Sequence, residues 1–193
     1  LDPGASVGSG TGLTADEITF AGSVILGSGA SLAGGSSVVA SSGSLQFLGG
    51  ITMGNNAVLG NLGASGVLSG SVLVNGLTAG SSGTIGAIAG FASVTFTDDL
   101  ILGSGTELVG LGSLGLLALD GDLTLEDNAR ITDGLSGLGL GANLIEISGT
   151  VSLGSGAVVG DIVFGESVAL GYGNGSTLEL GSGATLGSIQ SLE

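Results

Sequence analysis

The sequence predicts an all-β fold: a single-stranded, right-handed parallel β-helix, or β-solenoid, with about seven coils of about 26 residues each. Three observations lead to this prediction. A block of apolar positions recurs along the chain, and the apolar positions within a block lie two residues apart. Glycine makes up 43 of the 193 residues and is concentrated in the segments that separate the apolar stretches. Because the chain contains only one proline, backbone ladders can run without interruption.

The recurring block consists of two short apolar stretches, a turn and one further apolar position. Its first copy has Ile18, Phe20, Val24 and Leu26, then the turn Gly27-Ser28-Gly29-Ala30, then Leu32. Five copies keep the same block length, at 18–32, 45–59, 94–108, 117–131 and 145–159, while the connectors between them differ in length. A constant block with variable connectors is typical of repeat architectures, in which insertions collect in loops.

Two incomplete copies complete the pattern. A degraded copy begins at Val72 and Val74, and we expect it to lose register near residues 80–83. The last copy keeps only its second half, which includes Leu180 and Leu186. From Leu26 to Leu180 the chain makes six steps, which gives the mean period of about 26 residues.

The apolar positions are expected to line the interior of the stack. A spacing of two residues puts successive apolar side chains on one face of a strand, and glycine supplies the positive φ angles of sharp turns. A single coil cannot bury its own apolar face, whereas stacked coils bury a continuous core. Equivalent residues should therefore form columns, and the aromatic one consists of Phe20, Phe47, Val74, Phe96, Leu119 and Ile147.

The repeat also suggests how the chain is organised. Residues 1–16 are expected to be an N-terminal lead-in or capping segment, 17–191 the β-solenoid, and 192–193 a cloning scar. Because the chain begins at Leu1 without a leader pattern, we expect it to be a segment of a longer precursor. No apolar run approaches the roughly 18 residues of a membrane-spanning helix.

Composition excludes several classes of function. Histidine and cysteine are absent, so zinc sites, thiol chemistry and histidine-based acid–base catalysis lack their residues. The formal net charge is −15 and Arg130 is the only basic side chain, which excludes a surface for nucleic acid. No catalytic or cofactor-binding residues are predicted, because serine has no histidine or lysine to activate it and anionic sugars would lack basic partners.

Glu107 and Arg130 follow equivalent turns in adjacent copies. Stacking of the coils would bring the only cation of the chain beside a carboxylate. We expect an inter-coil ion pair on the surface, worth about 0–1 kcal/mol, with a structural role.

Four acids, Asp98, Asp99, Asp120 and Asp122, fall at the three-residue corners of two consecutive coils. We interpret them as a solvated acidic face. The alternative is a weak calcium site, since calcium prefers clustered oxygen ligands and needs six to eight of them. Calcium is the one cofactor that the sequence leaves open.

Further acids and aromatic residues lie outside these groups. Asp133 and Asp161 share another slot of the repeat, and the same two interpretations apply to them. Phe91 and Tyr172 lie outside the aromatic column. We expect both to pack beneath a connector, with exposed contact points for sugars or partners as the alternative.

The repeat from about residue 17 to 188 resembles the passenger regions of autotransporters and related filamentous adhesins. The resemblance rests on the Gly-Ser-Gly-Ala turns, the paired apolar stretches and an acidic, cysteine-free composition. Members of these groups are right-handed parallel β-helices that Gram-negative bacteria present on or release from the cell surface, often as stalks for adhesion. The same build also resembles surface-layer and biofilm-matrix proteins. No residue-level functional motif comes with the resemblance.

These observations lead to one main hypothesis and two alternatives. The main hypothesis is a non-enzymatic extracellular structural or adhesive module, a segment of a longer solenoid that serves as stalk, scaffold or matrix component. Its expected partners are neighbouring segments of the same protein, further copies joined end to end, and host surfaces or polysaccharides, with no nucleic acid. The first alternative is a module that binds polysaccharide, ice or mineral, and the second is a polysaccharide-degrading enzyme domain.

Overall fold

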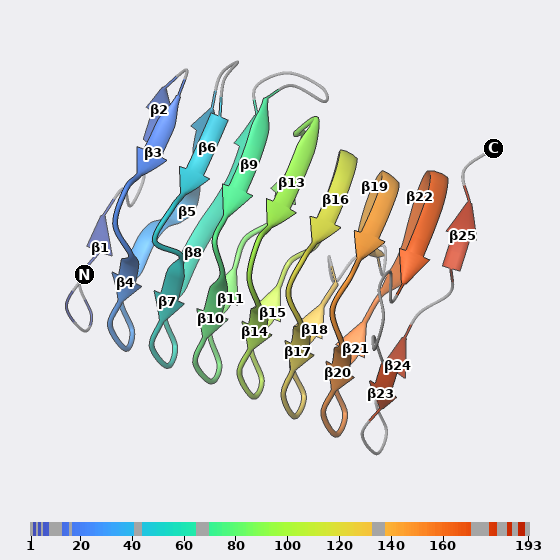
Figure 1. Cartoon of the computed structure of the whole chain (residues 1–193). Helices are drawn as coiled ribbons and strands as arrows, with labels where there is room; N and C mark the ends of the chain where they lie inside the picture. The colour runs from blue at the N-terminus through green and yellow to red at the C-terminus, as the bar shows by residue number, and fades with distance from the viewer. Residues whose placement is uncertain are drawn as a thin grey trace.

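The structure is a computed structural model that describes residues 2, 4, 6–7, 13–15, 17–40, 44–64, 70–132, 138–170, 178–180, 185–186 and 189–191. These residues form a stack of parallel strands, which confirms the predicted all-β solenoid. The coils lie side by side along one axis, with the N-terminus at one end of the stack and the C-terminus at the other (Figure 1).

One sheet of the stack contains a short strand from each coil. In the described part of the chain it has seven parallel strands, β4 (Val24–Leu26), β7 (Ile51–Met53), β10 (Leu77–Ala79), β14 (Leu100–Leu102), β17 (Leu123–Leu125), β20 (Val151–Leu153) and β23 (Leu178–Leu180). Alternate residues point in opposite directions, so the first and third residue of each strand from β7 to β20 are buried.

The remaining strands form the other walls of the solenoid. Strands that lead into the corner before the seven-stranded sheet are β3 (Ile18–Phe20), β6 (Ser44–Phe47), β9 (Ser71–Val74), β13 (Ser93–Phe96), β16 (Leu111–Leu119), β19 (Leu138–Ile147) and β22 (Asp161–Leu170). Strands that follow the turn are β1 (Ser6–Val7), β5 (Ser31–Ala40), β8 (Val58–Ala64), β11 (Thr84–Ile85), β12 (Ile88–Ala89), β15 (Glu107–Leu108), β18 (Arg130–Ile131), β21 (Val158–Val159) and β24 (Thr185–Leu186). Two further strands, β2 (Leu13–Ala15) and β25 (Ile189–Ser191), pair with β5 and β22.

The parallel ladder begins before residue 17. Strand β1 pairs with β5 through Ser6 and Ser31, and β2 pairs with the same strand through Leu13 and Val38. The segment expected to be a lead-in or cap thus contributes strands to the sheet.

The turns are linked to one another as regularly as the strands. Within the turn 27–30, the Ala30 N–H donates to the Gly27 carbonyl at 2.9 Å, and Gly29 has a φ of 69°. The Gly29 N–H then donates to the Asn55 carbonyl of the next turn at 2.8 Å. Inter-coil hydrogen bonds therefore continue through the turns and hold the coils together along their perimeter.

The aromatic column lies in the interior. The register pairs Phe20 with Phe47, Phe47 with Val74, Val74 with Phe96, Phe96 with Leu119, and Leu119 with Ile147. The Phe20 and Phe47 rings are stacked with their centroids 4.8 Å apart and their planes 3° apart. From Phe47 to Ile147 the column is buried, whereas Phe20 at its end is partly exposed.

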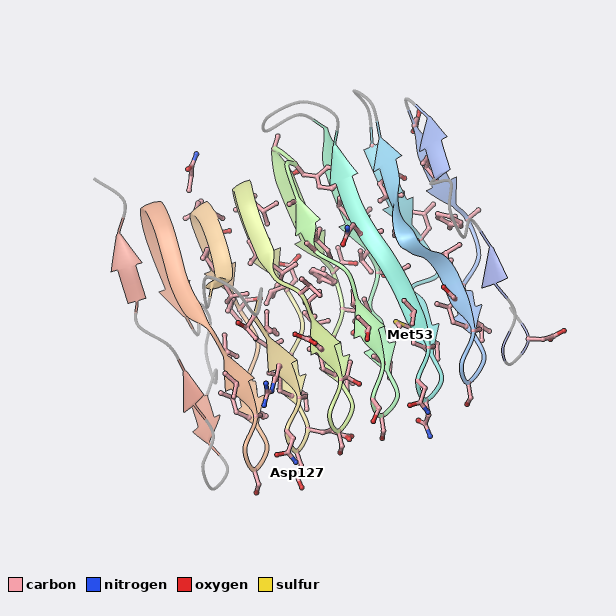
Figure 2. The ribbon with its side chains drawn as sticks, turned by 180° about the vertical axis from the view of Figure 1, so that it is seen from behind. Met53 and Asp127 are labelled. Atoms are coloured by element: carbon pink, nitrogen blue, oxygen red, sulfur yellow. The ribbon has the colours of Figure 1, made fainter. Side chains whose placement is uncertain are left out.

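The interior is closed to solvent on the seven-stranded side as well. Met53 on β7 is buried, whereas Asp127 lies in one of the turns at the rim of the stack, where its side chain is exposed (Figure 2). On this side, the apolar side chains of the strands thus lie in the interior, and the polar side chains of the turns lie in solvent.

The degraded copy does not lose register, contrary to the sequence-based expectation. Strand β10 keeps its place between β7 and β14, and β11 keeps its place between β8 and β15. The irregularity lies earlier, at the corner between Val74 and Leu77. That corner contains two residues, Asn75 and Gly76, where the other described corners contain three.

Candidate functional site

The four predicted corner acids lie on two adjacent corners of the solenoid. Asp98 and Asp99 connect β13 to β14, and Asp120 and Asp122 connect β16 to β17. Asp99 is half-buried and the other three are exposed. The structure thus brings these acids to one edge of the stack, with Asp99 and Asp122 at equivalent positions of neighbouring coils.

The carboxylates at this edge accept hydrogen bonds from the main chain. The Asp99 Oδ1 accepts from the Asp122 N–H at 2.9 Å, and the Asp122 Oδ1 accepts from the Thr150 N–H at 2.8 Å. The Asp98 Oδ1 accepts from the Asp99 N–H of its own corner at 2.9 Å. Each bond satisfies a corner N–H that has no place in a strand ladder, and two of the three join successive coils.

Glycine makes these inter-coil contacts sterically feasible. A Cβ on Gly121 would lie 2.8 Å from the Asp99 Oδ1 and 2.5 Å from the Asp98 carbonyl carbon. A Cβ on Gly149 would lie 2.7 Å from the Asp122 Oδ1 and, in addition, against the Gly121 carbonyl oxygen at 2.3 Å. An aspartate in one coil therefore requires a glycine in the next, directly before the N–H that it binds.

The same pairing recurs elsewhere on the solenoid, with asparagine as well as aspartate. The Asn55 Oδ1 accepts from Ser81 N–H after Gly80, at 3.0 Å, and the Asn61 Oδ1 accepts from Ala87 N–H after Gly86, at 2.9 Å. The Asp127 Oδ1 accepts from Ser155 N–H after Gly154, at 2.8 Å (Figure 2). We call these three contacts, together with those of Asp99 and Asp122, the five Asx–Gly pairs.

Sequence reasoning missed the Asx–Gly pairs. The signal was present, because each Asx is followed 22 to 27 residues later by a glycine. This separation varies with connector length, so the pairing emerges only once the coils are placed in register.

Glu126 accepts hydrogen bonds from the preceding coil, whereas the Asx–Gly pairs accept them from the following coil. The Glu126 Oε2 accepts from both the N–H and the hydroxyl of Ser104 in the preceding coil, at 3.1 and 3.0 Å. Neighbouring Glu126 and Asp127 thus tie one turn to the coils on both sides of it. Part of the large negative charge of the chain therefore has a structural use.

Metal binding by the acidic edge stays a prediction. Within the described ranges, no three or more acidic residues are grouped so that they could hold one metal ion. Asp133 lies outside the described residues, and Asp161 opens β22 opposite Leu138.

Glu107 and Arg130 are register partners on β15 and β18. Both side chains project from the outer surface, Glu107 half-buried and Arg130 exposed. The described residues include no ion pair between them, so the predicted ion pair stays a prediction that the backbone register permits.

Phe91 is fully buried and belongs to the core, as the packing interpretation expects. It is therefore no contact point for a sugar or a partner. Tyr172 lies outside the described residues.

A cavity of about 260 Å³ lies beside β8 and β11. Its lining consists of Val58, Leu59, Gly60, Asn61, Thr84, Gly86 and Val109. This lining contains no acidic or basic side chain.

Comparisons with protein-family models, with curated proteins and with solved structures found no match to the chain. In the described part of the chain, no helix has the length and apolar character required to cross a membrane.

Proposed function

We propose that the chain is a non-enzymatic, extracellular structural or adhesive module: a stiff segment of a longer β-solenoid that serves as stalk, scaffold or matrix component. The observation that carries this proposal is the continuity of the inter-coil hydrogen bonds. They run through the strands, through turns such as Gly29 to Asn55, and through corner bonds such as those of the Asp99 and Asp122 side chains.

Stiffness follows from this arrangement. Bending the rod would lengthen hydrogen bonds on several sides of a coil at once, because strands, turns and corners are all tied to the next coil. The negative charge adds to this by opposing lateral association of rods. A long, stiff and mutually repelling element suits a stalk or scaffold.

The proposal is tested by pulling on the chain. The chain is placed between two reference domains of known mechanical strength and stretched in a single-molecule force instrument, with force applied at its two ends. A scaffold should resist until coils release in succession. Extension at negligible force would contradict the proposal.

The surface-binding alternative rests on a different observation. The outward column at the centre of the seven-stranded sheet includes Thr52, Thr78 and Thr124, and Thr78 joins it because the degraded copy keeps its register. Ile25 and Ile101 interrupt the threonines. A glycan array and an ice-recrystallisation assay distinguish this alternative from the scaffold, which should be inactive in both.

A further inference from the structure

We infer that Asn75 and Gly76 form a site of spontaneous covalent modification, at which the Gly76 nitrogen attacks the Asn75 side chain and converts it to aspartyl or isoaspartyl residues. The inference is independent of the scaffold function. It rests on the hydrogen bonding of the shortened corner between β9 and β10.

The nucleophile of this reaction is the backbone nitrogen of Gly76. In the described part of the chain, the backbone bonds of this corner are donated by Asn75 N and accepted by Gly76 O, and none is donated by Gly76 N. At the equivalent place in the flanking coils the N–H is bound: Gly50 N donates to Phe47 O, and Asp99 N donates to the Asp98 Oδ1. In the described structure, the half-buried Gly76 N–H is therefore not held by a hydrogen bond.

The electrophile is the side-chain amide carbon of Asn75. The Thr97 hydroxyl donates to the Asn75 Oδ1 at 3.1 Å, and both side chains are exposed. This hydrogen bond draws electron density toward the side-chain oxygen and stabilises the negative charge that develops there during attack. The amide carbon is thereby activated at the edge of the molecule, where water has access.

Four other asparagines of the described chain, Asn55, Asn56, Asn61 and Asn128, lack this combination. The residue that follows each of them donates its N–H to a carbonyl: Asn56 to Ser81, Ala57 to Gly54, Leu62 to Ala87 and Ala129 to Glu126. Asn55, Asn56, Asn61 and Asn128 are therefore each followed by a nitrogen that is already engaged.

The chemistry balances with water as the only co-reactant. The Gly76 nitrogen loses its proton and bonds to the Asn75 Cγ, the bond from Cγ to the amide nitrogen breaks, and ammonia leaves. Water then opens the five-membered succinimide at either carbonyl. One product is aspartate at position 75. The other is an isoaspartyl linkage, which carries the main chain through the side chain and lengthens it by one atom.

The corner can accept the longer linkage. It has one residue fewer than its neighbours, so one added main-chain atom brings its path closer to theirs. Glycine at 76 also suits the crowding at this point, since a Cβ there would lie 3.3 Å from the Asp98 Cβ. Strands β9 and β10 should keep their pairing after conversion.

The experiment follows conversion in the native chain at mildly alkaline pH. Peptide mass spectrometry detects replacement of the amide by a hydroxyl, and enzymatic methylation detects isoaspartate. Asn75 should convert while Asn55, Asn61 and Asn128 persist. Thr97→Val should slow conversion about fivefold, the effect of losing one hydrogen bond. The second Asn-Gly sequence, Asn174-Gly175, serves as an internal reference that Thr97→Val leaves unchanged.

Three results would overturn the inference. Asn75 could persist in the folded chain and convert only in urea, which would mean that the fold protects it. Asn55 or Asn61 could convert as fast as Asn75 in the folded chain. Thr97→Val could accelerate the reaction, which would mean that the hydroxyl holds the amide away from the nitrogen.

Discussion

The Thr106 hydroxyl accepts a hydrogen bond from the Gly83 N–H of the preceding coil at 3.1 Å. The same hydroxyl donates to the Gly80 carbonyl. It thereby bridges the first and last residues of a turn that, in the described structure, lacks the direct bond seen in turns such as Gly27 to Ala30. Thr106 is fully buried in a column otherwise made of alanine and glycine, so the next coil supplies the closure that the degraded turn lacks.

Replacing this hydroxyl should be costly. Thr106→Val keeps the volume but leaves the buried Gly83 N–H and the Gly80 carbonyl without their partner, and we expect a loss of about 2 kcal/mol in the free energy of unfolding. Urea denaturation measures it. Thr106→Ser retains the hydroxyl and should lose much less. A larger loss for Thr106→Ser than for Thr106→Val would show that the methyl group, not the bridge, is what matters.

Substitutions at Asp122 should separate the effect of its acceptor oxygen from the effect of its negative charge. Asp122→Ala removes the acceptor for the Thr150 N–H and should lower the free energy of unfolding by about 1 kcal/mol. Asp122→Asn keeps an acceptor oxygen and removes repulsion from Asp99 in the neighbouring coil, so it should match or exceed the wild-type stability. Thermal unfolding at low ionic strength separates the two. If Asn were as harmful as Ala, the carboxylate would have a role beyond accepting this bond.

The glycine half of a pair should tolerate change less than the Asx half. A Cβ on Gly149 would lie 2.3 Å from the Gly121 carbonyl oxygen, so Gly149→Ala must displace main chain and should cost about 3 kcal/mol. Gly63 is the matched control, because a Cβ there meets nothing within 4 Å. Gly63→Ala should change stability by no more than about 0.5 kcal/mol. Circular dichroism during urea titration measures both, and similar midpoints would refute the close packing at Gly149.

The aromatic column predicts a large effect at its centre. Phe47 is fully buried between Phe20 and Val74, so Phe47→Ala should cost about 3–5 kcal/mol. The adjacent Leu48 is 45 % exposed, and Leu48→Ala should be nearly neutral. Calorimetric unfolding of both variants tests this contrast. A Phe47→Ala protein with wild-type stability would place the ring outside the core.

The sequence alone was sufficient for the parts of the fold that depend on local pattern. The alternation around Ile18 and Phe20 predicted strands, and the constant block length predicted which residues stack. The column from Phe20 to Ile147 follows from these two features, because hydrophobic burial leaves one register for strands with an apolar face.

The parts that could not be predicted depend on contacts between coils at irregular separations. The Thr106 bridge spans 23 residues to Gly83 and 26 to Gly80, and the Asp122 bond to Thr150 spans 28. The degraded copy was expected to lose register near residues 80–83. The structure keeps register there, and Thr106 of the next coil closes the turn that follows β10.

The central claim is the in-register stacking of the coils, and distances between spin labels test it most directly. The chain has no cysteine, so single cysteines can be introduced at outward positions of the seven-stranded sheet. Labels at Ile25 and Thr124 are separated by four strand intervals, and labels at Ile25 and Ser152 by five. At roughly 4.8 Å per interval, the structure predicts backbone separations of about 19 and 24 Å. Narrow distance distributions that differ by about one strand spacing are the expected result of pulsed electron paramagnetic resonance. Broad distributions, or a Ser152 label no farther from Ile25 than the Thr124 label, would contradict the solenoid.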